Sequence, residues 1–206
     1  MLYTKTYKTV EEQADLLIRR GLVCNRDTLI ERLNWINYYR LSGYLFPFRK
    51  LNSDDFVEGT NLDQVWERYC FDRKFRLLML DGIARIEVGL KTAIVLVFAR
   101  EYGPFGSMLK FYEGMHKNLQ NEISMAFSQQ KGAFISWMNS LNVVRNICAH
   151  HERLWNRILG VTPILFPKNK AKKRLLKLLE SYPNIPLCEM GFPEDWKKTP
   201  FFAEAA

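Results

Sequence analysis

The chain has 206 residues, 48% of them hydrophobic and 14% aromatic, and this composition excludes a wholly disordered protein. Its 30 lysine and arginine residues outnumber its 22 acidic residues, which gives a formal net charge of +8 at pH 7. Such a balance is typical of proteins that bind nucleic acid or a membrane surface, but many small domains are mildly basic without any such partner.

The cysteines indicate the compartment. They lie far apart and form no C-x-x-C pair: Cys24, Cys70, Cys148 and Cys188. This spacing argues against a zinc ribbon and against a disulfide framework, and free thiols suit a reducing compartment. The first residues lack the apolar run of a signal peptide, and the most hydrophobic stretch, 88–99, contains Lys91 and is too short to span a bilayer. We therefore expect a cytoplasmic protein with no membrane partner.

The first predicted helix carries its own start and stop signals. Thr9 and Glu12 form the S/T-x-x-E pattern of a capping box, so a helix should begin there. It should run to Arg20, because Gly21 is suited to end it.

A second helix is predicted after the polar residues 25–27. Apolar side chains at helical spacing continue it to about Arg40. Gly43 and Pro47 then interrupt the pattern. The polar stretch 49–61 predicts a loop.

The longest predicted helix covers residues 62–101. Its apolar residues recur with a period close to 3.6: Phe75, Met79, Ile83, Ile86, Leu90, Ile94 and Val97. Three acids stand four residues before a base: Asp72/Arg76, Asp81/Arg85 and Glu87/Lys91. Each pair should add about 0.2–0.5 kcal/mol to an exposed helix. The sequence Tyr102-Gly-Pro104 predicts the end of this helix.

Three further helices are predicted in the second half, over 114–128, over 134–151 and over 170–182. Prolines predict a connector at 160–169 and an irregular tail after 182. No segment alternates as the strands of a sheet would. We therefore predict an all-α fold, a helical bundle with a long central helix and an irregular C-terminal tail.

Three segments are expected within one compact domain. They are an N-terminal helical segment (1–48), a helical core (49–160) and a C-terminal basic helix with the tail (161–206).

Arg145, Asn146 and His150 form the strongest candidate site. The chain has three histidines, and two of them, His150 and His151, end a predicted helix. Asn146 and His150 are four residues apart and share a helix face, and the long side chain of Arg145 can reach the same end. A guanidinium, a carboxamide and an imidazole should then meet in one small volume.

Such a trio suits RNA cleavage without a metal ion or cofactor. The 2′-hydroxyl must lose a proton as it attacks the phosphorus, and the 5′-oxygen must gain one. Histidine, with an ordinary pKa near ~6.5, can do either, and a positioned acid or base is worth ~10²–10⁴-fold in rate. Arginine can meet the negative charge of the transition state.

Each feature also has a purely structural interpretation. An Arg-x4-His spacing alone arises often by chance, and the helix dipole favours histidine at a C-terminus. His116 stands alone in a weak helix and fits a surface or packing role. The basic residues of the last helix fit phosphate binding and a solvated face equally well: Lys170, Lys173, Arg174 and Lys177.

The stretch 144–156, Val-Arg-Asn-Ile-Cys-Ala-His-His-Glu-Arg-Leu-Trp-Asn, resembles the signature of the bacterial Abi-like abortive-infection family. That family belongs to the HEPN superfamily, which is marked by R-x4–6-H. Three more stretches resemble it in the right order: Arg20-Gly-Leu with 33–44, then 71–91, then 136–142. Together they cover most of residues 8–160.

The resemblance implies a HEPN bundle that dimerises and joins two Arg/His motifs in one composite site. It implies a metal-independent endoribonuclease, a growth-arresting toxin of phage defence or of a toxin–antitoxin pair, restrained by a small noncoding RNA or a protein antitoxin. Arg145 and His150 correspond to the catalytic pair, with Asn146 beside them. The resemblance also implies supporting positions for four further residues, although the last three fit the ion pairs described above equally well: His151, Glu87, Arg85 and Asp81. The family usually has a longer insertion where this chain has residues 103–135.

Two other functions stay open at this point. The first is a non-catalytic RNA-binding module, in which the Arg/His pair only clasps phosphate. The second is a regulatory subunit that binds another protein of a defence system. RNA or a second polypeptide that co-purifies with the protein would discriminate between them.

Overall fold

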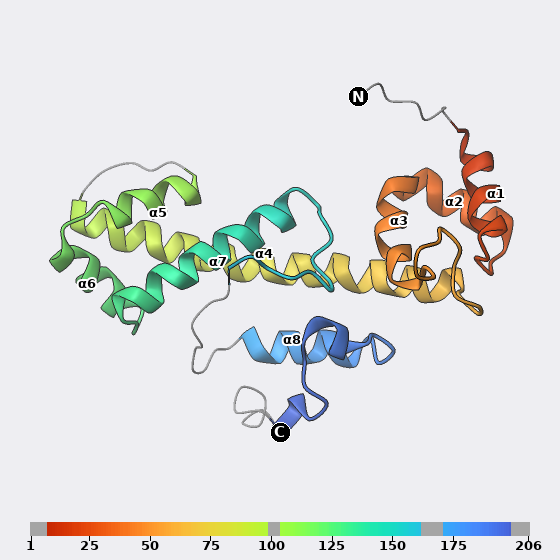
Figure 1. Cartoon of the computed structure of the whole chain (residues 1–206). Coiled ribbons are helices and arrows are strands. Elements are labelled where there is room, and N and C mark those ends of the chain that lie inside the picture. Colours follow the sequence, from red (N-terminus) through yellow and green to blue (C-terminus); the bar gives the residue numbers. More distant parts are fainter. Residues whose placement is uncertain (1–7, 99–103, 162–170, 199–206) are drawn as a thin grey trace. The chain divides into compact units, whose positions relative to one another are not determined.

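The computed structural model describes residues 8–98, 104–161 and 171–198. Eight α-helices and three short 3-10 helices make up the secondary structure of these residues (Figure 1). Apart from two isolated bridges, they contain no β structure. The predicted all-α class is therefore confirmed, and so is the long central helix, α4 (Leu62–Phe98).

The chain forms two compact units, residues 1–71 and residues 72–206. The helix α4 begins in the first unit and continues into the second. The three segments predicted from the sequence, divided after residues 48 and 160, follow a different division and stay a prediction.

The first unit opens with the predicted capping box. Thr9 Oγ1 accepts from the Glu12 N–H at 3.3 Å, and Glu12 Oε2 accepts from the Thr9 N–H at 2.8 Å. These bonds satisfy two amides at the start of α1 (Val10–Arg19). Gly21 follows with a φ of 98°, the left-handed conformation that glycine adopts without steric cost. The start and the stop of this helix were therefore predicted correctly.

The second predicted helix is two helices, α2 (Arg26–Ile36) and α3 (Tyr38–Leu45), followed by a 3-10 turn, η1 (Phe46–Phe48). The break lies at Asn37, which has a φ of 65° and whose Oδ1 accepts from the Tyr39 N–H at 2.8 Å. The prediction of one helix broken at Gly43 was wrong, because Asn37 caps a new helix that runs through Gly43.

The loop 49–61 is held by charge. Asp54 accepts from Arg20 at 2.5 Å and from Arg49 at 3.0 Å.

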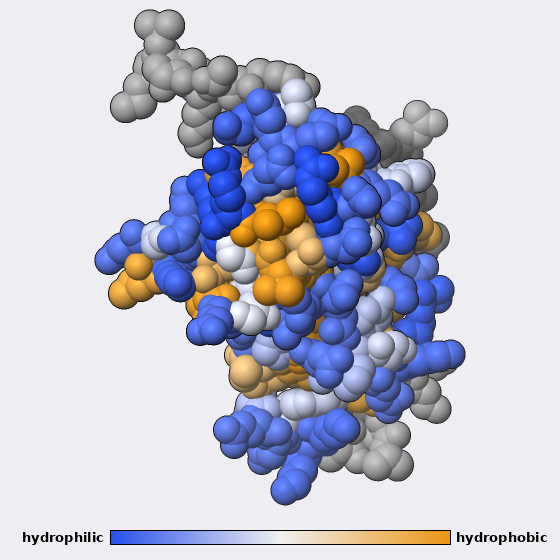
Figure 2. Space-filling view, turned by 90° about the vertical axis from the view of Figure 1, so that its right-hand side faces the viewer, coloured by the Kyte–Doolittle hydropathy of each residue, from blue (hydrophilic) through white to orange (hydrophobic). Residues whose placement is uncertain are grey.

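Figure 2 shows apolar side chains surrounded by hydrophilic ones on a face of this unit. The large apolar side chains that this unit exposes are Val23, Trp35, Tyr39, Phe46, Leu51 and Val57.

The second unit contains the rest of α4 with α5 (Phe105–Glu113), α6 (Lys117–Ala126), α7 (Lys131–Ala149) and α8 (Ala171–Glu180). Two 3-10 turns follow, η2 (Leu187–Met190) and η3 (Trp196–Lys198). One hydrophobic core joins α4, α5, α6 and α7. Its members include Leu90, Ile94, Tyr112, Phe134 and Ile147.

The helix α5 was not predicted, although its apolar residues have helical spacing: Phe105, Met108, Leu109 and Tyr112 are all buried. Two side-chain hydrogen bonds join α5 to α6. Tyr112 Oη donates to the Gln120 carbonyl at 2.8 Å, and Gln120 Nε2 donates to the Tyr112 carbonyl at 2.9 Å. These reciprocal bonds give two buried polar side chains partners inside the core.

Candidate functional site

The Arg145–His150 motif lies at the C-terminal end of α7. Val144, Ile147 and Cys148 face the core and are buried, whereas Asn146 and His150 lie on the opposite, exposed face. Arg145 is half-buried between the two faces. The sequence of α7 therefore separates a packing face from a face that presents polar groups to solvent.

The backbone after α7 forms a Schellman turn. His150 is the C-cap, the Glu152 N–H donates to the Ile147 carbonyl at 2.9 Å, and the His151 N–H donates to the Cys148 carbonyl at 3.1 Å. His151 takes the left-handed position of this turn with a φ of 57°. Glycine is the usual residue there, so His151 holds a demanding backbone position beside His150.

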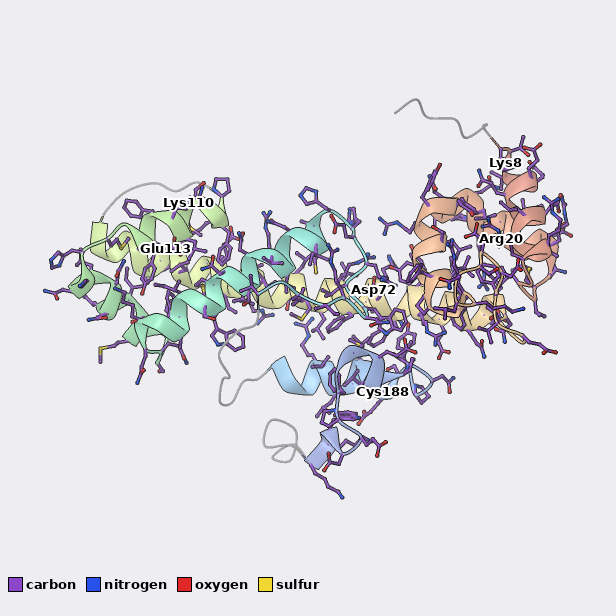
Figure 3. The ribbon with its side chains drawn as sticks, in the orientation of Figure 1. Lys8, Arg20, Asp72, Lys110, Glu113 and Cys188 are labelled. Carbon is purple, nitrogen blue, oxygen red and sulfur yellow. The ribbon has the colours of Figure 1, made fainter. Side chains whose placement is uncertain are left out.

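A buried ion pair on α4 fixes this turn. Asp72 and Arg76 are one helical turn apart, with 3.4 Å between Oδ2 and Nη1, and their side chains are 0% and 6% exposed. Figure 3 labels Asp72 on α4. The spacing predicted this pair on an exposed helix, and that prediction was wrong.

Both members of the pair bind backbone groups that follow α7. Asp72 Oδ1 accepts from the N–H groups of Leu154 at 3.0 Å and Trp155 at 2.6 Å. Arg76 Nη1 donates to the carbonyls of His151 at 2.9 Å and Glu152 at 2.8 Å. Four backbone groups between residues 151 and 155 thus have charged partners, which orders the chain directly after His150.

Two neighbouring grooves meet at Asn146. The larger, of about 410 Å³, lies between α5 and α7 and is lined in part by Arg145 and Asn146. The smaller, of about 300 Å³, is lined in part by Asn146, His150 and Arg157. Arg145 Nη1 donates to Asn146 Oδ1 at 3.4 Å. Within one chain Asn146 therefore borders both grooves, and Arg145 and His150 line different ones.

Of the four residues matched to supporting positions, three lie away from the Arg145–His150 motif. Asp81 accepts a hydrogen bond from Arg174 of α8, which lowers the pKa of this carboxyl, and lies 3.4 Å from Arg85. Glu87 accepts from Lys91 at 3.0 Å, as their spacing predicted. Asp81, Arg85 and Glu87 line neither groove. Only His151 adjoins the motif, through its backbone.

The predicted RNA-binding residues of the last helix have different environments. Arg174 is bound to Asp81, and Lys177 is exposed. Lys170 and the side chain of Lys173 lie outside the described residues. The apolar stripe of this helix packs in part, with Leu179 buried, and Tyr182 lies under the Lys74 ammonium at 4.8 Å.

Sequence reasoning missed Asp72 and Arg76 as residues of the site. Their signal was present, since an acid stands four residues before a base within the stretch 71–91 that resembles the family. What the spacing could not give is burial, which depends on a turn about 80 residues later in the chain. Cys148 is buried beside them, and this burial raises the pKa of its thiol to about 11.

Among the described residues, no cluster of three or more histidine, cysteine, aspartate or glutamate side chains has the arrangement of a metal site. None of the helices found in these ranges is both long enough and apolar enough to traverse a bilayer.

The chain matches the family model described as Abi-like protein. The matches cover residues 31–105 and 98–156, which together exceed half of the chain and include α7 with Arg145, Asn146 and His150. The pair Asp72 and Arg76 lies within the first matched region. No curated protein and no solved structure matches the chain. On the extent of the family match, the chain belongs to the Abi-like protein family.

Proposed function

We propose that this protein is a metal-independent endoribonuclease of the HEPN type. It would act as a growth-arresting toxin in phage defence or in a toxin–antitoxin pair. The observation that carries the proposal is the exposed imidazole of His150 at the end of α7, on a turn anchored by Asp72 and Arg76. The family match supports a role in abortive infection, because it spans the whole motif.

The proposed reaction is an internal transesterification of RNA. The imidazole of one His150 takes the proton of the 2′-hydroxyl while the 2′-oxygen bonds to the adjacent phosphorus. The bond from phosphorus to the 5′-oxygen breaks, and a protonated imidazole gives its proton to that oxygen. The products are a 2′,3′-cyclic phosphate and a free 5′-hydroxyl, and the substrate itself supplies the nucleophile.

Arg145 and Asn146 support this chemistry from the same helix end. The guanidinium of Arg145 can pair with the phosphate oxygens as negative charge grows on them. Asn146 borders the grooves of both Arg145 and His150, so its carboxamide can orient either the imidazole or a phosphate oxygen. Neither residue has to move a proton.

A second copy of the chain completes the site in this proposal. One chain has one His150, whereas the reaction uses a base and an acid. Within a chain, Arg145 and His150 also line different grooves. A homodimer that apposes the two α7 ends supplies two imidazoles and two guanidinium groups. A small noncoding RNA or a protein antitoxin that covers these ends would restrain the enzyme.

The test is cleavage of RNA by the purified protein in EDTA. The parent should produce fragments with 2′,3′-cyclic phosphate ends, and His150→Ala and Arg145→Ala should each lower the rate by at least ~10²-fold. Matched controls are His116→Ala and Arg19→Ala, which remove an exposed histidine and an exposed arginine outside the site. Their rates should equal that of the parent.

A binding assay at several salt concentrations, run beside the cleavage assay, separates cleavage from binding alone. The separation of Arg145 and His150 into two grooves of one chain also suits an RNA-binding module that clasps phosphate without cutting it. Binding that weakens steeply with salt, with no cleavage by the parent, would favour that second function.

A further inference from the structure

The groove between α5 and α7 has a polar wall of which the proposed cleavage chemistry uses only Arg145 and Asn146. Asn139, Asn142 and Asn146 line it from α7, and Ser107 and Lys110 line it from α5. The three asparagines are three and four residues apart, so they form one ladder along α7 that ends at Asn146, next to Arg145. Figure 3 labels Lys110 and Glu113 on α5, the helix that forms the other wall.

Asn142 occupies the middle of this ladder. It is half-buried, and its amide packs against Gly106, where an added Cβ would stand 3.5 Å from Nδ2. Among the described residues the amide of Asn142 has no hydrogen-bond partner. A carboxamide offers two donors and an acceptor with two lone pairs, so a half-buried one without partners can pair with a planar polar group in the groove.

The lining of the groove carries more positive than negative charge. Arg145 and Lys110 are its two cations, and Glu113 is its acidic residue. Glu113 is engaged by Asn139, whose Nδ2 donates to Oε1 at 3.4 Å. Two cations beside a ladder of neutral amides suit a ligand that carries an anion next to an uncharged polar ring.

An unpaired nucleotide has this chemistry. Asparagine side chains pair with the donor and acceptor edges of bases, and RNA presents those edges in single-stranded regions. Lysine and arginine bind its phosphate. The volume of about 410 Å³ lies within the range of sites that hold small molecules.

We propose that the groove between α5 and α7 binds the base and phosphate of an unpaired nucleotide next to the linkage that is cut. The inference rests on the proposed endoribonuclease activity and names its specificity site. Asn142 forms hydrogen bonds with the base, and Lys110 binds a phosphate. Arg145, which also lines the groove, binds the phosphate that reacts. The enzyme therefore cuts single-stranded RNA with a preference at one position beside the scissile bond.

The test compares Asn142→Ala and Lys110→Ala with the matched variants Asn118→Ala and Lys117→Ala, whose side chains are exposed on α6. Cleavage of a random-sequence RNA by each protein gives the base preference at every position near the cut. Fluorescence anisotropy of labelled single-stranded hexanucleotides, in a His150→Ala background, gives binding without cleavage.

The two groove variants should behave differently. Asn142→Ala should abolish the preference at one position and weaken binding of the preferred hexanucleotide by roughly ten-fold, with little change for the others. Lys110→Ala should weaken binding of all sequences alike and lower the salt dependence by about one ion. The α6 variants should match the parent in both assays.

Failure of this inference is distinct from failure of the proposed function. If the parent cleaves and His150→Ala does not, but Asn142→Ala keeps the parent's base preference and affinity, only the specificity site is wrong. If the parent does not cleave, the binding assay still tests whether the groove binds a nucleotide. Weaker binding by Asn142→Ala, with unchanged binding by Asn118→Ala, supports nucleotide binding in the groove. Equal competition by an acidic peptide would overturn it in favour of a general anion surface.

Discussion

Arg76 of α4 donates a hydrogen bond to the His151 carbonyl at 2.9 Å, across 75 positions of the chain. The same guanidinium is paired with Asp72, whose carboxylate binds the N–H groups of Leu154 and Trp155. The turn that carries His150 and His151 is therefore anchored to α4 by charge rather than by apolar contacts alone. Such an anchor pre-organises a site without contributing an atom to the reaction.

Asp72→Ala should destabilise the protein more than any other single change to a charge on α4. It leaves the Arg76 guanidinium buried without its carboxylate and two backbone N–H groups without an acceptor, a loss of roughly 3–5 kcal/mol. Asp81→Ala is the matched control, because the ion pairs of Asp81 are exposed and should contribute far less to stability. Urea unfolding measures both. Equal losses for the two variants would contradict the anchoring role of Asp72.

His151→Gly should leave stability unchanged or raise it by up to ~1 kcal/mol. The residue has a φ of 57°, a conformation that costs other residues energy and costs glycine none. His151→Ala should be the less stable of the two variants. Thermal unfolding of the pair checks this order, and the reverse order would exclude the left-handed turn. Because the glycine variant keeps the backbone, its cleavage rate reports on the imidazole of His151 alone.

Cys148 should be unreactive in the folded protein, in contrast to Cys188, which is exposed. Burial raises the pKa of Cys148 to about 11, so at pH 8 only about one thiol in a thousand is ionised. Alkylation by iodoacetamide, followed by mass spectrometry, should label Cys188 first. The rate at Cys148 should rise about ten-fold per pH unit up to that pKa. Equal labelling of both residues at pH 8 would contradict the buried environment.

The raised pKa of Cys148 also predicts the direction in which the free energy of unfolding changes with pH. Above its usual value near 9 the unfolded chain loses this proton, whereas the folded chain keeps it until pH approaches 11. Stability should therefore fall as pH rises through that window. Cys148→Ala removes this contribution, and its stability should depend less steeply on pH over the same range. An equal slope in the two proteins would be inconsistent with a buried thiol.

Local signals predicted local structure. Thr9, Glu12 and Gly21 lie within one helix of each other, so the sequence alone was enough to delimit α1. The break at Asn37 was missed because the helical spacing of apolar residues continues across it. The cap is a single hydrogen bond, which the Tyr39 N–H donates to Asn37 Oδ1. The apolar spacing of α5 was present and was overlooked beside the stronger break at Pro104.

The candidate site, too, was only partly predictable from the sequence. Asn146 and His150 share the exposed face that their spacing predicted, because four residues complete about one turn. The expectation that Arg145 and His150 reach one small volume within a chain stays a prediction, since the two residues line adjoining grooves that share Asn146. Asp72 and Arg76 could not be identified from spacing, because their partners are backbone atoms far along the sequence.

In the proposed function, the imidazole of His150 cuts RNA and thereby stops growth. The decisive measurement induces the parent, His150→Ala and the exposed-histidine control His116→Ala in a bacterium, while growth and total RNA integrity are followed together. The parent and His116→Ala should arrest growth as their RNA fragments, and His150→Ala, present at an equal level, should do neither. Growth arrest with fragmented RNA in the His150→Ala strain would contradict the assignment.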